Sequence, residues 1–243
     1  DLRHNINNFL QYLNLKNMTT YREIVYLVLD ELKINSDDSY FTEEHIAFLA
    51  DKYRAFILKQ RYSDIKKPIP RSNYQQLCLD LLEVPAISGE PCEGGSYLRT
   101  KYKIAVPMLI GNPTIYPIDA FQGAYITYIS KERMRYVGHN KYLKNIIYAA
   151  LAPDGYLYFK SSNPQYLYLE KVRMDGIFES SIEASKLGCG DVPCDALDFE
   201  FPLEASLIPP VVELIVKELT QAEYKPEDMN NNAKDEFGDV KQR

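Results

Sequence analysis

The feature that most constrains this fold is a helical pattern near the end of the chain, from Ser206 to Tyr224 (SLIPPVVELIVKELTQAEY). Pro209 and Pro210 suit the first turn of a helix, where a missing amide proton leaves no hydrogen bond unmade. Seven apolar residues then recur with helical period: Val211, Val212, Leu214, Ile215, Val216, Leu219 and Ala222. Together with Leu207 and Ile208 they cover an arc of about 200°, whereas a surface helix needs only about 100°. The helix is therefore predicted to be covered on two sides.

Two explanations fit such an arc. The helix is either the central element of one globular domain, or it packs on one side against a neighbouring copy of the same chain. The second explanation defines a candidate subunit interface of six residues: Val211, Val212, Leu214, Ile215, Val216 and Leu219. Both explanations require partner helices from elsewhere in the sequence.

Two helices are predicted before the middle of the chain. In the first, Thr20 and Glu23 form a capping box that satisfies free amides at the start of the helix. Its apolar face consists of Tyr21, Ile24, Val25, Val28, Leu29 and Leu32. Thr42 caps the second helix. The apolar stripe of that helix is Ile46, Leu49, Ala50, Tyr53, Phe56 and Ile57, with Lys52, Arg54, Lys59 and Arg61 on its polar side.

Between residues 74 and 178 the pattern changes to short strands with turns between them, the strongest turn being Pro153-Asp-Gly155. Strands are expected at 75–84, 97–110, 125–129, 134–138, 143–151, 156–160 and 166–174. This pattern favours an antiparallel sandwich or small barrel over alternating strands and helices. We therefore predict an α+β fold, in which a helical bundle (18–65 and 195–224) carries an inserted antiparallel β-domain (70–180).

Both ends of the chain differ from the rest in composition. Residues 1–17 are rich in Asn with few apolar side chains, which predicts a poor helix or a flexible arm, with Met18 as the natural start. The residues from 225 to 243 are polar, so we expect an extended tail that is ordered only against a partner.

The bulk composition argues against several functional classes. A formal net charge of −6 disfavours a dedicated nucleic-acid-binding face. No apolar run approaches the roughly 20 residues that cross a bilayer, and the N-terminus lacks the apolar core of a signal peptide. Cys78, Cys92, Cys189 and Cys194 are too few for a disulfide framework in 243 residues, which predicts a reducing compartment.

A search for reactive groups yields no catalytic, cofactor-binding or metal site. Cys189 and Cys194 lack the spacing of a zinc knuckle, and we expect them to form an exposed, oxidisable pair. Phosphate-binding and nucleophile-elbow motifs are absent from the sequence. The histidines are scattered: His4, His45 and His139. The chain is therefore not expected to be an enzyme, although carboxylates far apart in sequence could still meet in space.

One basic and aromatic zone lies between residues 128 and 144. Its members are Tyr128, Lys131, Arg133, Arg135, Tyr136, Lys141, Tyr142 and Lys144. Such a zone could serve as a platform for nucleic acid. A sheet edge protected by charge explains it as well, and is the explanation we favour.

Five long segments of the chain resemble a structural protein of crAss-like phages that infect gut Bacteroidales. The segments are MTTYREIVYLVLDELK, FTEEHIAFLADKYRAFILKQRYSDIKKPIP, LLEVPAISGEPCEGGSYLRTK, RMRYVGHNKYLKNIIYAALAPDGYLYFKSSNPQYLYLEKVRMDGIFE and FPLEASLIPPVVELIVKEL. The resemblance runs from Met18 to about residue 237.

This resemblance implies a virion component of the phage neck, a head-to-tail connector that assembles in the host cytoplasm. It implies a ring of about twelve copies under the portal protein, beside other neck or tail rings, with DNA passing through the bore without sequence-specific binding. No catalytic residues are implied. The tail is then a candidate portal-docking segment, through Tyr224, Pro226, Asp228, Asn231 and Asn232. The alternative is a binding module whose Tyr-rich β-domain (the chain has 20 Tyr) holds a glycan or host receptor.

Overall fold

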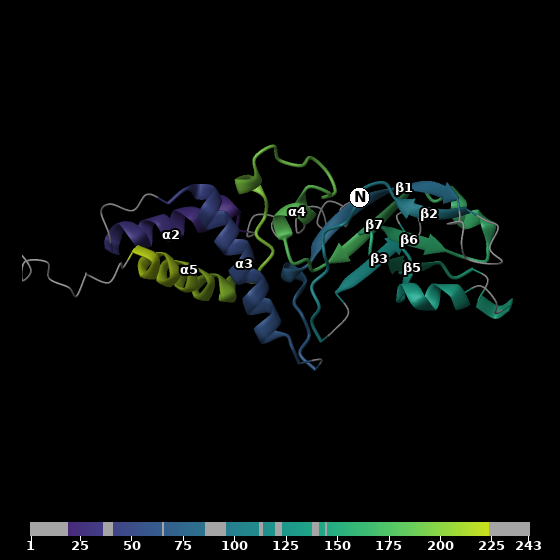
Figure 1. The fold of residues 1–243 in the computed structure, drawn as a ribbon, viewed down its shortest axis with the longest axis horizontal. Coiled ribbons are helices and arrows are strands. Elements are labelled where there is room, and N and C mark those ends of the chain that lie inside the picture. The colour runs from purple at the N-terminus through teal and green to yellow at the C-terminus, as the bar shows by residue number, and fades with distance from the viewer. Residues whose placement is uncertain are drawn as a thin grey trace, which may run out of the picture.

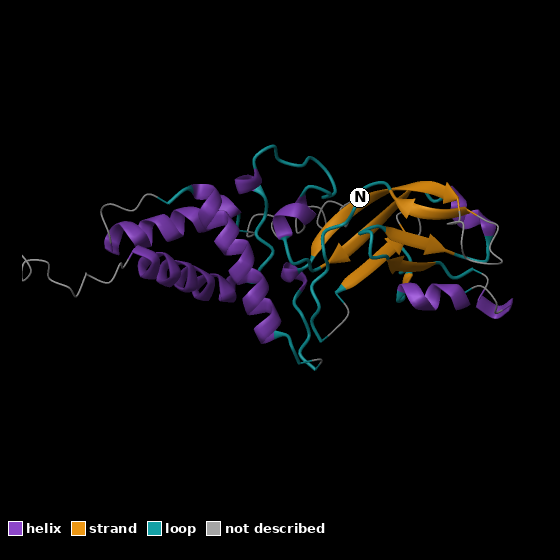
Figure 2. Cartoon of the chain, in the orientation of Figure 1, coloured by secondary structure: helices purple, strands orange, loops and turns teal. Residues whose placement is uncertain are grey.

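The computed structural model describes residues 19–35, 41–64, 66–85, 96–111, 114–119, 123–137, 141–143 and 145–223. The molecule is elongated, with helices gathered at one end and strands at the other (Figures 1 and 2). The predicted class, α+β, is confirmed by these helices and by a seven-stranded sheet.

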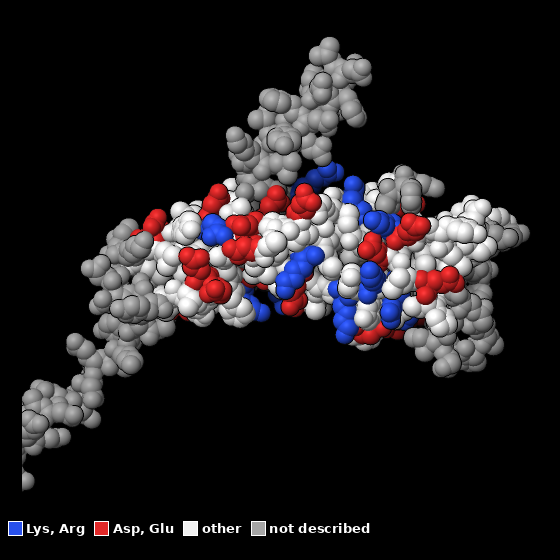
Figure 3. All heavy atoms as spheres, turned by 90° about the horizontal axis from the view of Figure 1, so that it is seen from above, with Lys and Arg blue, Asp and Glu red and all other residues white. Residues whose placement is uncertain are grey.

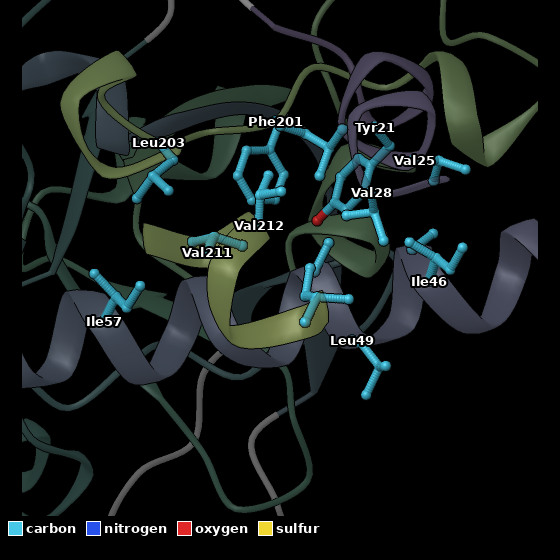
Figure 4. Close-up of a cluster of buried hydrophobic side chains, with 14 of the residues drawn as sticks. Tyr21, Val25, Val28, Ile46, Leu49, Ile57, Phe201, Leu203, Val211 and Val212 are labelled. Carbon is cyan, nitrogen blue, oxygen red and sulfur yellow. The ribbon is translucent and has the colours of Figure 1, made fainter. Parts of the chain in front are cut away.

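Three helices pack on one another in the helical part: α2 (Tyr21–Asn35), α3 (Glu43–Arg61) and α5 (Ile208–Glu223). The predicted capping box of α2 is confirmed, because the Thr20 amide donates to Glu23 and the Glu23 amide donates to the Thr20 hydroxyl, both at 3.3 Å. The apolar face of α2 fills the centre of the bundle. Figure 4 shows Tyr21 and Val28 from this face beside Phe201, with Val211 and Val212 of α5 next to them.

Helix α3 differs from the prediction at two residues. Its cap is as expected, since the His45 amide donates to the Thr42 hydroxyl at 3.3 Å. Phe56, however, was placed in the apolar stripe and is 56% exposed, because α2 and α5 cover a face centred on Ala50, Ile57 and Leu58 instead. Arg54 was placed on the polar side and is fully buried, because residues 178–181 of the strand part cover it.

The strand part contains seven strands in the order β3-β7-β1-β2-β6-β5-β4. Their bounds are β1 Gln75–Pro85, β2 Ser96–Thr100, β3 Ile115–Asp119, β4 Thr127–Tyr128, β5 Tyr148–Leu151, β6 Leu157–Lys160 and β7 Lys171–Gly176. The long strand β1 pairs with β7 over its first half (Leu77↔Met174) and with β2 over its second half (Leu81↔Thr100). Alternate side chains of β1 point into a second core together with Phe159 and Phe178.

The two edges of the sheet are joined by residues 124–129, which favours a barrel over a sandwich. On one side the Ile126 amide donates to the carbonyl of Pro117 in β3 at 2.8 Å. On the other side the Ile129 amide donates to the carbonyl of Ala149 in β5 at 2.8 Å. This connecting segment runs parallel to β5, so the prediction of a purely antiparallel sheet is wrong at the β4–β5 pair.

Local predictions failed where proline or tertiary contacts override the pattern. Strand β3 was missed because Pro117 interrupts it, and proline is expected only at sheet edges. Residues 134–138 were predicted as a strand, but 134–136 belong to a 3₁₀ helix, η2 (Lys131–Tyr136), and residue 138 lies outside the described residues. Helix η2 covers Tyr158 and Ala150 on the outside of the sheet. The start of the expected strand 166–174 is also a 3₁₀ turn, η4 (Pro164–Tyr168).

A disulfide joins Cys78 of β1 to Cys189, which follows the short helix α4 (Ser181–Ser185). The expectation that Cys189 pairs with Cys194 is therefore wrong, and Cys194 is an exposed free thiol. A backbone hydrogen bond brings Cys189 close to Cys78, because the Cys78 amide donates to the carbonyl of Leu187, two residues before Cys189, at 3.0 Å. The two cysteines are 111 positions apart, so the sequence gives no sign of their proximity.

Candidate functional site

The six residues of the candidate subunit interface lie on α5, and the structure places most of their surface inside the subunit. Val211, Val212, Ile215 and Leu219 are at most 4% exposed, because α2 and α3 enclose α5 from two sides. Leu214 and Val216 are only partly buried against the same core. The subunit's own helices thus account for most of the wide apolar arc, and of these six residues only Leu214 and Val216 retain surface for a neighbour.

The candidate portal-docking residues lie outside the described residues. These are Tyr224, Pro226, Asp228, Asn231 and Asn232. The last described residue before them is Glu223, the final residue of α5. The C-terminal end of helix α5 lies on the side of the molecule away from the strands (Figure 1).

A buried polar network joins the helical part to the strand part. The Arg54 guanidinium donates through Nη2 to the carbonyl oxygens of Phe178 (2.6 Å) and Glu179 (3.3 Å), and through Nε to Asp51 Oδ1 (3.3 Å). The same Asp51 oxygen accepts from the Ser181 amide at 3.0 Å and from the Ser181 hydroxyl at 2.6 Å. These contacts attach the middle of α3 to the end of the strand part.

The hydroxyl of Tyr21 completes this network from α2. It donates to Asp51 Oδ1 at 2.9 Å and contacts the Ser181 hydroxyl. Burial, and then the nearby Asp51 carboxylate, raise the pKa of Tyr21 far above its usual value, so the phenol stays protonated and remains a donor. The network thus links α2, α3 and the residues that follow β7 through one buried ion pair and its hydrogen bonds.

Charge is divided between the two parts of the molecule. The helical segments 19–64 and 195–223 contain 16 Asp or Glu and 7 Lys or Arg, a formal net charge of −9. By contrast, residues 97–160 of the strand part contain 9 Lys or Arg and 3 Asp or Glu. Figure 3 shows the same division on one face, with acidic residues over the helices and most basic residues nearer the strands.

The helical part exposes two pairs of large apolar side chains on different helices. On α2, Tyr26 and Leu27 are each 48% exposed. They line a groove of about 490 Å³ that is completed by Ile208 and Pro209 at the start of α5. On α3, Phe48 and Phe56 are 53% and 56% exposed. Adjacent exposed apolar side chains of this kind are candidate contact surfaces for another protein.

The basic residues of the strand part lie over tyrosine rings. Lys131 is 4.4 Å from the ring centre of Tyr158, and Arg99 is 4.2 Å from that of Tyr156. Of the predicted basic zone, Tyr136 and Tyr142 are about 80% exposed. The side chains of Arg135, Lys141 and Lys144 lie outside the described residues. The positive charges of Arg99 and Lys131 are therefore partly stabilised by cation–π contacts inside the same chain.

A second groove, of about 610 Å³, lies on the outer face of β3, β7 and the start of β1. Three tyrosines line it, namely Tyr74, Tyr116 and Tyr125, together with Arg71 and Arg173. The rings of Tyr74 and Tyr116 are 5.9 Å apart. Burial, followed by the neighbouring Tyr116, raises the pKa of Tyr74 to about 12, so the Tyr74 phenol is neutral and its ring acts as an apolar wall with a polar edge.

The described residues hold no cluster of three His, Cys, Asp or Glu side chains that could bind a metal ion. His45 stacks on Phe41, with the ring centres 6.5 Å apart, while His4 and His139 lie outside the described residues. No described helix has both the length and the apolarity that a membrane crossing requires.

Comparison with known proteins identifies the family of this chain. The chain is similar to "Ring protein 2" of Bacteroides phage crAss001, with 61% identity over 225 residues, which cover 91% of this chain and the whole of that protein. A family model described as phage tail ring protein 2 matches residues 23–237, which confirms the resemblance seen in the sequence. The chain therefore belongs to the phage tail ring protein 2 family of crAss-like phages.

Proposed function

We propose that this protein is a structural subunit of the virion that forms a ring in the neck of a tailed phage, connects the portal to the tail, and lets DNA pass. The observation that carries the proposal is the 61% identity to a protein named as a ring protein over that protein's whole length. The ring contains about twelve copies and assembles in the host cytoplasm. The protein has a structural role and no catalytic one.

In this proposal the two parts of the subunit have separate tasks. Residues 18–65 and 195–224 form the oligomerisation domain, into which the β-domain of residues 70–180 is inserted. The exposed apolar pairs on α2 and α3 support this assignment, since a ring subunit needs different surfaces for its left and right neighbours. Leu214 and Val216, still partly exposed on α5, are further candidates for such contacts.

We propose that the acidic helical part, rather than the strand part with its basic segment 97–160, lines the passage for DNA. Its formal net charge of −9 would repel the phosphate backbone and prevent the DNA from adhering while it moves. Glu213, exposed on α5, is a suitable position for a test. Glu213→Lys should slow DNA ejection from virions without lowering the melting temperature of the subunit; unchanged ejection from several such variants would contradict the proposal.

The polar tail is proposed to dock on the portal protein or on a neighbouring ring. Its candidate contacts are Tyr224, Pro226, Asp228, Asn231 and Asn232. Deleting residues 225–243 should leave a folded subunit with at least tenfold weaker binding to purified portal. Binding of undiminished strength by the deleted form would remove the tail from the proposal.

The decisive test of the ring is native mass spectrometry of the full chain, alone and with portal protein from the same phage. A closed assembly of defined copy number, seen as rings by electron microscopy, is the expected result. A chain that remains monomeric at all concentrations and beside the portal would refute the proposal.

The tyrosine-lined groove supports a second candidate function, the binding of a glycan. Stacked tyrosines between arginine side chains offer sugar rings both apolar faces and hydrogen-bond donors. Tyr74→Ala and Tyr116→Ala should abolish binding to a glycan array in this case. The absence of binding by the unmodified protein would leave the ring as the only proposal.

A further inference from the structure

Two exposed strips on the helical part have the same length and opposite charges, and each carries large apolar side chains. The acidic strip on α2 consists of Glu23, Tyr26, Leu27 and Asp30. The basic strip on α3 consists of Lys52, Phe56 and Lys59, continued at one end by Phe48. All of these side chains are exposed.

The two strips have the same internal spacing. Glu23 and Asp30 are seven residues apart, as are Lys52 and Lys59, which is about 10.5 Å along a helix in both cases. Seven residues are close to two helical turns, so each pair of charges lies on one face of its helix. Each pair flanks apolar side chains: Tyr26 and Leu27 on α2, and Phe56 on α3.

The surroundings of each strip suit a contact with the other. The α2 strip lines one side of the groove of about 490 Å³, whose apolar lining includes Leu27 and Ile208. An aromatic ring such as that of Phe56 can enter this groove. Neither Lys52 nor Lys59 forms an ion pair with a carboxylate among the described residues. Lys52 instead lies 5.3 Å from the ring centre of Phe48.

We infer that the acidic strip on α2 of one copy docks on the basic strip on α3 of the next copy. This inference rests on the proposed ring function and names the surfaces through which neighbours meet. Because the two strips differ, the contact is heterologous, and repeating it closes a ring when the rotation from one copy to the next divides a full turn evenly. Phe56 enters the groove beside Leu27, while the two lysines lie against Glu23 and Asp30.

Cysteine cross-linking tests this pairing directly. Full-length chains would carry Leu27→Cys and Phe56→Cys, singly or together, with Cys92→Ser and Cys194→Ser to remove other thiols. Under mild oxidation the double variant should form a ladder of covalent multimers that collapses on reduction. Each single variant should remain a single band, because neither strip meets its own copy. A ladder from one single variant, or none from the double variant, would overturn the inference.

Substitutions of the basic strip provide a second measurement. Phe56→Ser, and separately the double change Lys52→Glu with Lys59→Glu, should raise the concentration needed for assembly at least tenfold. Melting temperatures should change little, since these side chains are exposed within the subunit. Tyr168→Ser is the matched control, because Tyr168 is an exposed aromatic residue of the strand part.

The outcomes separate this inference from the proposed function. Rings that form normally in all these variants would overturn the strip pairing and leave the ring function intact. An unmodified chain that never assembles, alone or with the portal, would refute the ring function itself.

Discussion

Replacing Arg54 by Met should test the buried network that joins the two parts. Arg54 is fully buried, and it forms one short hydrogen bond (2.6 Å to Phe178) and two long ones (3.3 Å to Glu179 and Asp51). A charged hydrogen bond contributes about 1.5–3 kcal/mol. If each long bond contributes about 0.5–1 kcal/mol, the sum is about 2.5–5 kcal/mol. Breaking a buried ion pair costs about 3–5 kcal/mol, which agrees with this sum.

Urea denaturation followed by circular dichroism and by tyrosine fluorescence measures this loss. The two signals report on different parts, since helices dominate the first and many tyrosines lie among the strands. In the unmodified protein both should change together, and in Arg54→Met the two transitions should separate because the parts are uncoupled. Arg61→Met is the matched control on the same helix. Its guanidinium is half exposed, 3.3 Å from Glu204, so the expected loss is under about 1 kcal/mol.

A double-mutant cycle distinguishes the ion pair from simple packing. Asp51→Asn in the Arg54→Met background should recover part of the lost stability, because the uncompensated carboxylate is removed while an oxygen remains for the Ser181 and Tyr21 donors. A loss below about 1 kcal/mol for Arg54→Met alone, with both transitions still coincident, would refute the reasoning.

Three further changes test other features of the fold. Ile215→Asp buries an unpaired charge beside α2 and α3 and should destabilise the subunit by several kcal/mol, about 3–5 by analogy with a broken buried pair; a folded variant in circular dichroism would contradict the burial of α5. Cys78→Ser opens a loop of 111 residues and should cost about 2–4 kcal/mol, with no additional effect of reductant on its melting temperature. The Leu197 amide, and then Arg22, hold the pKa of Asp195 below its usual 3.8. The Asp195 carboxylate therefore stabilises the fold above pH 3.8, and this contribution is lost as the pH falls through the lower pKa of the folded state. Asp195→Asn should flatten the acid side of a stability–pH curve.

Helix positions and caps could be predicted because their causes are local. Thr20, Glu23 and Thr42 form caps within three residues of sequence, and the apolar period of α2 sets which face is buried. The same period on α5 could not tell whether its second face meets the subunit's own helices or a neighbour. That choice depends on where α3 crosses α5, which is a tertiary property.

Failures in the strand part have a different cause. The alternation at Leu77, Leu79 and Leu81 identified β1, but nothing in the sequence indicated that β1 bends from one half of the sheet to the other. Strand β3 was not predicted because it contains Pro117. Proline is tolerated there because the side of β3 that lacks the amide proton faces the short segment 124–126 and not a regular strand. For the junction, one signal was available: Asp51 and Arg54 are three residues apart on one helix, a spacing that brings opposite charges together.

The closed sheet and the buried junction together constrain how the subunit can assemble. Because residues 124–129 occupy the edges of both β3 and β5, those edges cannot accept a strand from a neighbour, so lateral contacts fall to side-chain surfaces. The strips on α2 and α3 are candidates for such contacts, because they carry exposed large apolar side chains. If neighbours meet there, the Asp51–Arg54–Ser181 network determines where each strand part lies relative to the ring. Weakening the network should therefore leave subunit contacts in place but make the strand parts variable in position, which averaged electron-microscopy images would show as blurred density at that end alone.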